Sequence, residues 1–453
     1  MKREYCPCLS IRRAILRNVH TSLLVLFSIV LAAAPATAQV VNLNPVTIGD
    51  RAFGLGGAFT ALASDATAGW YNPAGLGFLD RTYINATGNV YSYEHSRAEN
   101  FIVIEPTTGT GGSANLDEKQ IQATPSTFSL AKSLGNRGTV GFGVYVPRDI
   151  NVEDSFAVGA NYASQLLGPT HQDFYERDSF SERNIYLGPS YGVRLNESIS
   201  VGTSAFILYS TTDLDSLMNL TLTATGATGS ESRISKEKVT FWGTRFLLGT
   251  KAEFGGLHLG LSAFTPTIRI SEKTDSSLIN SGIISGGSQS VSIGSRNTTN
   301  TGRGWELAAG LGWEEKNSWA TELDVTYYIP EFRHDIAARN VANVKVGGEY
   351  SLTDEYRLRA GFFTDFSPWR GTLESDDRSY DIDIYGFTLQ LENHDYFPNS
   401  KIMRSFSVGV RYAFGNGNVL GTFSNPTTNG FSTPRRDLSY ESIAIMLGGT
   451  LSY

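Results

Sequence analysis

The sequence predicts an all-β protein: a transmembrane antiparallel β-barrel of about 14 strands, with an N-terminal hatch segment inside its lumen. Three observations lead to this prediction. Apolar residues alternate with small, polar or charged residues through most of the chain after residue 81. The links between the alternating stretches are long and short in turn. The chain ends on an apolar stretch whose last residue, Tyr453, is aromatic.

The N-terminus has the parts of an export signal. Five basic residues precede an apolar run at 21–34 that is too short to span a bilayer, and 36–38 reads Ala-Thr-Ala, a cleavage site of small residues. We therefore expect 1–38 to be a signal peptide, with an uncleaved anchor as the less favoured alternative. Cys6 and Cys8 both lie within it, so the exported chain would have no thiol.

Composition and charge indicate which partners the chain can bind and which kind of segment could cross a membrane. The chain has a net charge of −7. Without the five basic residues and one acid of the signal, the charge becomes about −11, which argues against a nucleic-acid partner. No later stretch has about 18 apolar residues, so a membrane role has to depend on strands, because only helices and closed barrels satisfy every backbone group in lipid.

The alternation leaves complete apolar faces. Within 405–414, one face carries only large apolar residues, and the other carries serine, glycine, alanine and Arg411. Stretches at 139–146, 256–264 and 356–362 follow the same rule. A soluble β-sandwich would also alternate, but strands of about ten residues with aromatic ends fit a membrane barrel better.

The links between strands show a regular asymmetry. We expect strands near 81–94, 120–133, 138–147, 183–194, 198–211, 238–252, 256–270, 302–313, 318–328, 341–350, 355–365, 403–414, 417–424 and 439–453. Long loops follow the odd-numbered strands, including one at 366–402, and tight turns follow the even-numbered ones, including one at Gly415-Asn416. Outer-membrane barrels have this arrangement, with long loops outside and short turns in the periplasm.

The last strand, 439–453, has an apolar face and an aromatic end. Such an end is the usual signal by which outer-membrane barrels are recognised for insertion, so we expect the barrel-assembly machinery and outer-membrane lipid as partners. As a soluble edge strand it would invite aggregation, which closure against the first strand would prevent.

The segment 39–80 precedes the first strand and is rich in glycine and alanine. A barrel of about 14 strands has a lumen wider than its own side chains can easily fill, so this segment can fold back as a plug. The expected domains are the signal 1–38, the hatch 39–80 and the barrel 81–453. Asp65 could cap a helical turn, and Pro73 fixes a bend. The candidate gating residues are Gly54, Gly56, Gly57, Asp65, Asn72, Pro73 and Ala74.

Three places resemble the FadL family of outer-membrane transporters for long-chain fatty acids and other hydrophobic compounds. They are the hatch motifs Gly-Leu-Gly-Gly-Ala at 54–58, Ser-Asp-Ala at 64–66 and Asn-Pro-Ala at 72–74, the hairpin at 345–368, and the stretch 405–414. The resemblance implies that a hydrophobic ligand binds outside, passes to a lumen pocket, and leaves through a lateral opening after the hatch shifts. It implies passive diffusion with no cofactor.

The sequence offers little evidence for phosphate binding, catalysis or metal binding. The Gly-rich run at 54–57 lacks the strand–turn–helix context and lysine of a phosphate-binding loop, so a packing role is favoured. No His-Glu-x-x-His motif occurs, and the sequence does not show a serine or acid pair with a positioned base, so we expect neither an enzyme nor a catalytic residue. Asp376, Asp377, Asp381 and Asp383 could hold calcium, but a solvated acidic loop is favoured, so no metal is expected.

Eight charged residues are expected on the lumen face: Glu306, Glu322, Asp324, Lys345, Glu349, Arg357, Arg359 and Arg411. Among them, Arg359 and Arg411 could pair with a ligand carboxylate, unless the wall charges pair with one another. Counting back from the turn near 351–355 puts Glu349 opposite Arg357 as a wall ion pair, and Arg359 opposite Gly347.

Two functions remain open. The first is passive transport of long-chain fatty acids or other hydrophobic small molecules across a Gram-negative outer membrane, through a hatch-gated barrel with lateral release. The alternative is a non-transporting outer-membrane barrel that acts as a scaffold for secretion or surface assembly.

Overall fold

The computed structural model describes residues 39–40, 42, 46–164, 168–224, 227–284, 290–294, 303–315, 318–330, 339–368, 379–397, 402–428 and 430–453. The predicted signal peptide 1–38 lies outside the described residues. Within the described part of the chain, no helix is both long and apolar enough to cross a membrane.

Fourteen antiparallel strands close into a barrel, as the sequence predicts. The last strand pairs with the first, from Tyr83↔Ser452 to Ala98↔Leu438, which removes both sheet edges. The wall consists of β2 Tyr83–Ile104, β4 Gly112–Ser133, β5 Thr139–Ser164, β6 Gly168–Arg194, β7 Ile199–Ala224, β8 Ala227–Phe254, β9 Leu257–Phe264 with its continuation β10 Ile268–Ile284, β12 Trp305–Glu315, β13 Trp319–Ile329, β14 Val341–Ser351, β15 Tyr356–Asp365, β16 Ser379–Tyr396, β17 Met403–Leu420 and β20 Arg435–Ser452.

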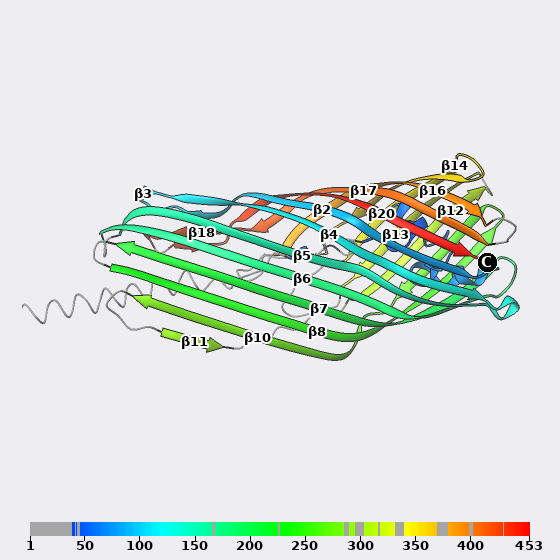
Figure 1. The fold of residues 1–453 in the computed structure, drawn as a ribbon, viewed down its shortest axis with the longest axis horizontal. Helices are drawn as coiled ribbons and strands as arrows, with labels where there is room; N and C mark the ends of the chain where they lie inside the picture. Colours follow the sequence, from blue (N-terminus) through cyan, green and yellow to red (C-terminus); the bar gives the residue numbers. More distant parts are fainter. Residues whose placement is uncertain are drawn as a thin grey trace, which may run out of the picture.

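Short strands complete the sheet. They are β1 Gln39–Val40, which pairs in parallel with β16, and β3 Gly109–Thr110, β11 Ser290–Gly294, β18 Thr422–Asn425 and β19 Gly430–Ser432. We call the end of the barrel with the tight links the turn end, and the opposite end the loop end. Both the start of β2 and the C-terminus lie at the turn end (Figure 1).

One predicted strand is wrong, and one was missed. The strand expected at 417–424 and the turn at Gly415-Asn416 do not exist, because β17 runs unbroken to Leu420. The missing strand is β16, inside the predicted 366–402 loop. A Cβ at Gly415 would lie 2.5 Å from the Asp383 carbonyl oxygen, and one at Gly417 would lie 1.9 Å from that of Asp381. These glycines therefore accommodate a neighbouring strand rather than a turn.

Most of the predicted long loops at 148–182 and 212–237 are also strand. The reason is visible in β7, where the polarity of the two faces reverses along its length. Near the turn end, the outward residues include the exposed Ile207, and the buried inward ones include Ser204. Further along, Asp213 and Asp215 face out and form ion pairs, whereas Met218 and Leu220 are buried inside. The wall therefore passes from lipid into water while the strand continues.

The wall is tall on one side and short on the other. Strands β5–β8 have 26 to 28 residues, but β12–β15 have 10 or 11. The green strands of Figure 1 accordingly run the length of the molecule, and the yellow ones occupy only the part near the turn end.

An apolar band surrounds the barrel. Large apolar side chains that point outward and remain exposed include Phe128, Val140, Phe142, Ile207, Leu248, Leu261, Leu311, Leu323, Val325, Val346, Leu389, Phe406, Val408 and Ile443. Exposed aromatic residues flank the band, with Trp313, Trp319 and Tyr350 toward the turn end and Trp242 and Trp305 toward the loop end. This arrangement is that of a barrel embedded in a bilayer.

Candidate functional site

The segment 46–79, which we call the plug, lies inside the barrel near the turn end (blue in Figure 1). It contains α2 Asp50–Gly54, α3 Ala68–Tyr71 and the 3₁₀ helix η1 Pro73–Phe78. Nearly all of its residues are buried. The plug touches wall strands on opposite sides of the lumen, since α2 contacts β15–β17 and η1 contacts β6–β8.

Two of the candidate gating glycines adopt a left-handed backbone. Gly56 has φ +68° and Gly57 has φ +86°, which other residues rarely adopt. Gly54 ends α2 where a Cβ would lie 2.2 Å from Gln390 Oε1. The chain therefore turns sharply after α2 while staying against the wall.

Glycines on the lumen side of the wall leave room for the plug to pack closely against it. A Cβ at any of them would overlap plug backbone or a short plug side chain: at Gly361 it would lie 2.2 Å from the Gly56 nitrogen, and at Gly202 2.3 Å from the Pro73 carbonyl carbon. The same holds for Gly192, Gly249, Gly260, Gly310 and Gly347. Close contact between two backbones thus requires glycine on the wall as well as in the plug.

The Asn72-Pro73-Ala74 motif fastens the plug to β7 and β8. Asn72 Nδ2 donates to the carbonyl oxygens of Thr60 (2.9 Å) and Thr250 (3.0 Å), and its Oδ1 accepts from Ala74 N (3.2 Å). Pro73 is the first residue of η1, and the Ala74 carbonyl accepts from Ser200 Oγ at 2.7 Å. Asn72 thereby caps a helix, joins two parts of the plug, and holds both to the wall.

Asp65 stabilises a turn rather than the end of a helix. Its Oδ1 accepts from the backbone nitrogen (2.7 Å) and the hydroxyl (2.6 Å) of Thr67. Helix α3 begins one residue later, and its N-cap Thr67 makes no side-chain capping bond. Burial raises the pKa of Asp65, and the bonds from Thr67 oppose that shift.

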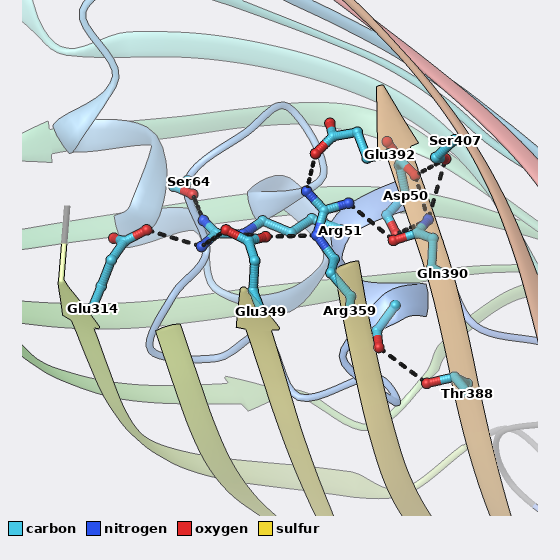
Figure 2. Close-up of polar contacts among 11 residues, drawn as sticks. Asp50, Arg51, Ser64, Glu314, Glu349, Arg359, Thr388, Gln390, Glu392 and Ser407 are labelled. Carbon is cyan, nitrogen blue, oxygen red and sulfur yellow. Dashed lines mark hydrogen bonds and ion pairs between the residues drawn. The ribbon is translucent and has the colours of Figure 1, made fainter. Parts of the chain in front are cut away.

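Two arginines and three glutamates tie the plug to the wall at α2 (Figure 2). Arg51 of α2 donates to Glu349 at 3.1 Å, to Glu314 at 2.9 Å and to Ser64 Oγ at 2.7 Å. Arg359 of β15 donates to Glu349 at 2.6 Å, and also to Glu392 and to Gln390 Oε1. Glu349 thus joins a plug arginine to a wall arginine.

The expected register of this hairpin is wrong. Glu349 lies opposite Arg359, Arg357 lies opposite Ser351, and Gly347 faces Gly361. The turn is centred one residue later than expected, on Asp354, and a backbone bond from Leu352 N to Tyr356 O closes it. Arg359 is only 2% exposed, and each of its three guanidinium nitrogens donates a hydrogen bond to a wall side chain.

Asp50 anchors the start of α2. Gln390 Nε2 donates to its Oδ1 at 2.7 Å, and Ser407 Oγ donates to the same oxygen. Burial raises the pKa of Asp50 to about 6, and the Arg359 guanidinium opposes this shift. No motif in the chain singles out Asp50, because its partners lie more than 300 residues away.

Two carboxylates of β13 hold the middle of the plug. Asp324 Oδ2 accepts from the backbone nitrogens of Phe59 (2.9 Å) and Thr60 (3.0 Å) and from Thr60 Oγ1 (2.8 Å). Glu322 accepts from the nitrogens of Ala61 (2.5 Å) and Leu62 (3.1 Å). The lumen alternation predicted their inward direction but not their backbone partners.

Arg411 differs from Arg359. It is 6% exposed, its guanidinium carbon lies 4.5 Å from the centre of the Phe363 ring, and its Nε has no hydrogen-bond partner within the described residues. It lies at the base of an apolar cluster, which we call the loop-end cluster. That cluster contains Phe101, Ile102, Ile104, Leu116, Phe156, Val158, Phe174, Met218, Leu220, Leu222, Phe363, Ile382, Ile384, Val419, Leu438 and Tyr440.

A small cavity of about 60 Å³ lies between the plug and the loop-end half of the lumen. Trp70 and Tyr71 of the plug, Phe264 of β9 and Pro147 of β5 line it, together with the charged Lys345, Arg303 and Glu306. Trp70 sits in an aromatic group, with ring centres 5.1 Å from Tyr145 and 5.3 Å from Phe264.

Next to this cavity, the adjacent wall strands β4 and β5 are unpaired over most of their length, and we call this unpaired stretch the seam. Strands β4 and β5 pair only from Ser133↔Thr139 to Thr127↔Tyr145, although both continue far beyond. The β5–β6 register shifts directly after Tyr145, around Val146 and Pro147. Above this point, the described contacts across the seam include a bond from Gln122 Nε2 to the Asp149 carbonyl oxygen at 3.0 Å.

The four aspartates considered for calcium are only partly within the described residues. Within the described residues, no group of three or more acidic, histidine or cysteine side chains is placed to hold a metal ion. Asp376 and Asp377 lie outside the described residues. Asp383 belongs to β16 and pairs with Arg339 at 3.4 Å.

Comparisons place this fold among known barrels. No family model and no curated protein matches the sequence. A Pseudomonas aeruginosa FadL homologue superposes with a TM-score of 0.58 at 14% identity, covering 90% of this chain and 99% of that one. The CymD monoaromatic hydrocarbon channel gives 0.54 at 14% identity (91% and 99% covered), and the Ralstonia pickettii toluene transporter TbuX gives 0.51 at 11% (89% and 98%).

At these identities, the likeness concerns the fold. The chain has the fold of the FadL homologue and of these hydrocarbon channels, as the hatch and hairpin motifs predicted. None of the three is described as an enzyme. With its closed wall and apolar band, the chain is an integral barrel of an outer membrane.

Proposed function

We propose that this chain, which shares the FadL fold, carries hydrophobic small molecules across the outer membrane by passive diffusion. The observation that supports this most is the loop-end cluster. A porin lumen is polar and filled with water, but here apolar side chains from β2, β4–β7, β15–β17 and β20 meet inside the wall. An apolar molecule partitions into such a region without a cofactor, because its own surface leaves water.

We propose further that long-chain fatty acids, or amphiphiles like them, are among the ligands. Arg411 supports this proposal, because a buried guanidinium with an unpaired Nε can accept the carboxylate of a chain whose tail lies in the loop-end cluster. Arg359, the other candidate, is less suitable. Each of its three guanidinium nitrogens already donates to Glu349, Gln390 or Glu392.

The exit that fits this geometry best is the seam between β4 and β5. The cavity beside Trp70 reaches Pro147 at the seam, whereas the plug obstructs the axial route at the turn end. In this proposal the plug acts as a hatch, with Gly54, Gly56, Gly57, Asp65 and the Asn72-Pro73-Ala74 motif setting its closed position. A ligand then leaves sideways into the lipid.

Uptake of a labelled long-chain fatty acid and of toluene tests the proposal, in cells that lack the gene and in the same cells complemented with it. Complementation should restore uptake, and organic extraction of the purified barrel should release a bound amphiphile. If no amphiphile is released and deletion leaves uptake unchanged, transport is rejected. Co-purification of a stable protein partner would then favour a scaffold for secretion or surface assembly.

Membrane insertion requires partners of its own. The last strand ends in the exposed, aromatic Tyr453, and its outward face carries Ile443, Ile445 and Leu451. We propose that the barrel-assembly machinery recognises this strand and that outer-membrane lipid covers the apolar band. Deleting Tyr453 should lower the amount of barrel in the outer membrane without changing its synthesis.

A further inference from the structure

Strand β13 binds the plug through a continuous run of backbone N–H donors. Four consecutive backbone N–H groups, at 59–62, and the Thr60 hydroxyl all point to one strand of the wall. Only two side chains, Glu322 and Asp324, receive them, and each is 1% exposed. They lie two residues apart, so both project into the lumen from the same face of the strand.

The wall around these carboxylates is shaped for the plug. In the neighbouring strand β12, Gly312 lies opposite Glu322, and Gly310 lies opposite Asp324. A Cβ at Gly310 would lie 2.8 Å from the Ala61 nitrogen, and one at Gly260, the next strand along, would lie 2.3 Å from the Thr60 carbonyl oxygen. The glycines leave space for the plug backbone, and the two carboxyl groups on the adjacent strand bind it.

The donors distinguish these bonds from the other plug contacts. At the Asn72 motif a single side-chain amide makes the bonds, and the Arg51 bonds join two side chains, which can adjust. At β13, the carboxyl oxygens accept from main-chain donors that cannot turn away without moving the plug. A buried carboxylate that lost these donors would be left unpaired in the lumen, so the plug is held as long as the site stays closed.

These bonds also border the cavity. Thr60, whose nitrogen and hydroxyl both bind Asp324, lines the cavity together with Gly57 and Lys345. Lys345 lies directly opposite Asp324 in the next strand. A molecule that enters the cavity therefore touches the residue by which β13 holds the plug.

We propose that Glu322 and Asp324 are the latch of the plug: they hold 59–62 against β13, and the plug leaves its closed position when these five hydrogen bonds are given up. This inference rests on the proposed function in taking the plug as movable. It assigns a positioning role to two wall residues that make no contact with the lipid and need not contact a ligand.

A unique thiol tests the latch without reference to transport. Ala58 is fully buried beside the latch, and the exported chain would have no other cysteine, so Ala58→Cys reports access to this part of the plug. In the purified barrel, we expect the double variant Glu322→Gln, Asp324→Asn to raise the rate of maleimide labelling at this thiol at least tenfold. The amides keep the shape of the carboxyl groups but replace one acceptor oxygen of each with an NH2 group, which cannot accept from the plug N–H groups.

Glu306→Gln is the matched control. It removes a lumen carboxylate on the neighbouring strand β12 that has no hydrogen bond to the plug among those described, and it should leave the labelling rate unchanged. The barrel itself is checked by its heat-dependent gel mobility. If the double variant does not fold, each single variant serves, with a smaller increase expected.

Equal labelling of the latch variant and the parent, with both barrels folded, overturns the latch. Faster labelling of the Glu306→Gln control by the same factor also overturns it, since any lumen charge would then do. Because labelling needs no ligand, failure here is distinct from failure of uptake, which bears on the proposed function alone.

Discussion

Glu349 of β14 accepts hydrogen bonds from two arginines, Arg359 of the adjacent strand at 2.6 Å and Arg51 of the plug at 3.1 Å. This one carboxylate joins the wall to the segment that fills it. Since Arg359 also binds Glu392 and Gln390, the arginine belongs to the anchor of the plug rather than to an empty binding site.

The two lumen arginines should therefore respond differently to substitution. Arg359→Gln leaves Glu349 and Glu392 buried with fewer partners, which costs about 3–5 kcal/mol when a buried pair is broken, so the thermal stability of the purified barrel should fall. Arg411→Gln should lower the stability less, because the Arg411 Nε makes no hydrogen bond within the described residues, and should lower the affinity for a long-chain fatty acid, but not for toluene. Equal losses of both ligands in Arg411→Gln would remove its carboxylate role.

A methyl group at the right wall glycine should displace the plug. In Gly361→Ala, the new Cβ meets the Gly56 nitrogen at 2.2 Å, and backbone cannot yield as a side chain does. Gly348→Ala, on the same hairpin, meets only the Ala320 carbonyl oxygen at 3.9 Å. We expect protease cleavage within the plug to speed up in the first variant and not in the second. Identical cleavage of the two would show that the contact does not position the plug.

The Asn72-Pro73-Ala74 motif should matter for uptake more than for the barrel. Replacing Asn72 and Pro73 with alanine removes three hydrogen bonds of Asn72, each contributing about 1 kcal/mol, and the preset backbone of η1. Uptake should fall several-fold at equal surface levels while gel mobility stays that of a folded barrel. Unchanged uptake would exclude a gating role for the motif.

Docking of the plug should weaken as pH rises between about 4 and 6. The folded pKa of Asp50, about 6, lies above the ordinary value of 3.8, so the docked plug favours the protonated acid. The stabilisation is full below 3.8 and is lost as pH rises through 6. In Asp50→Asn, hydrogen exchange of α2 should be slower than in the parent at pH 7, and the ratio of the two rates should approach one near pH 4. A constant ratio would show that Asp50 does not titrate in this range.

A cross-link over the seam should block release. Gln122 and Asp149 face each other across the unpaired part of β4 and β5, so cysteines at these positions can be joined by a short bis-maleimide. Cysteines at Leu130 and Phe142, which lie opposite each other where β4 and β5 are paired, provide the control. We expect cross-linking to stop uptake only in the first pair. Normal uptake through a cross-linked seam would rule out this exit.

The sequence by itself determined the class of fold and the place of the plug segment in the chain. An outward apolar band and inward polar residues follow from alternation with period two, because lipid and lumen impose opposite demands on neighbouring residues. The strand number was right although β16 was missed and 417–424 was taken for a strand. Two glycines in β17 look like a turn until β16 is seen to press against them.

Only the tertiary structure decided the partners inside the lumen. Glu322 and Asp324 read as inward charges, yet nothing in the chain pointed to plug amides about 260 residues earlier as their donors. The register that joins Glu349 to Arg359 depended on the position of one turn, and a shift there changes which charges meet. Periodicity is local and can be read along the chain, whereas the contacts that close the barrel around its plug exist only once distant strands have been brought together.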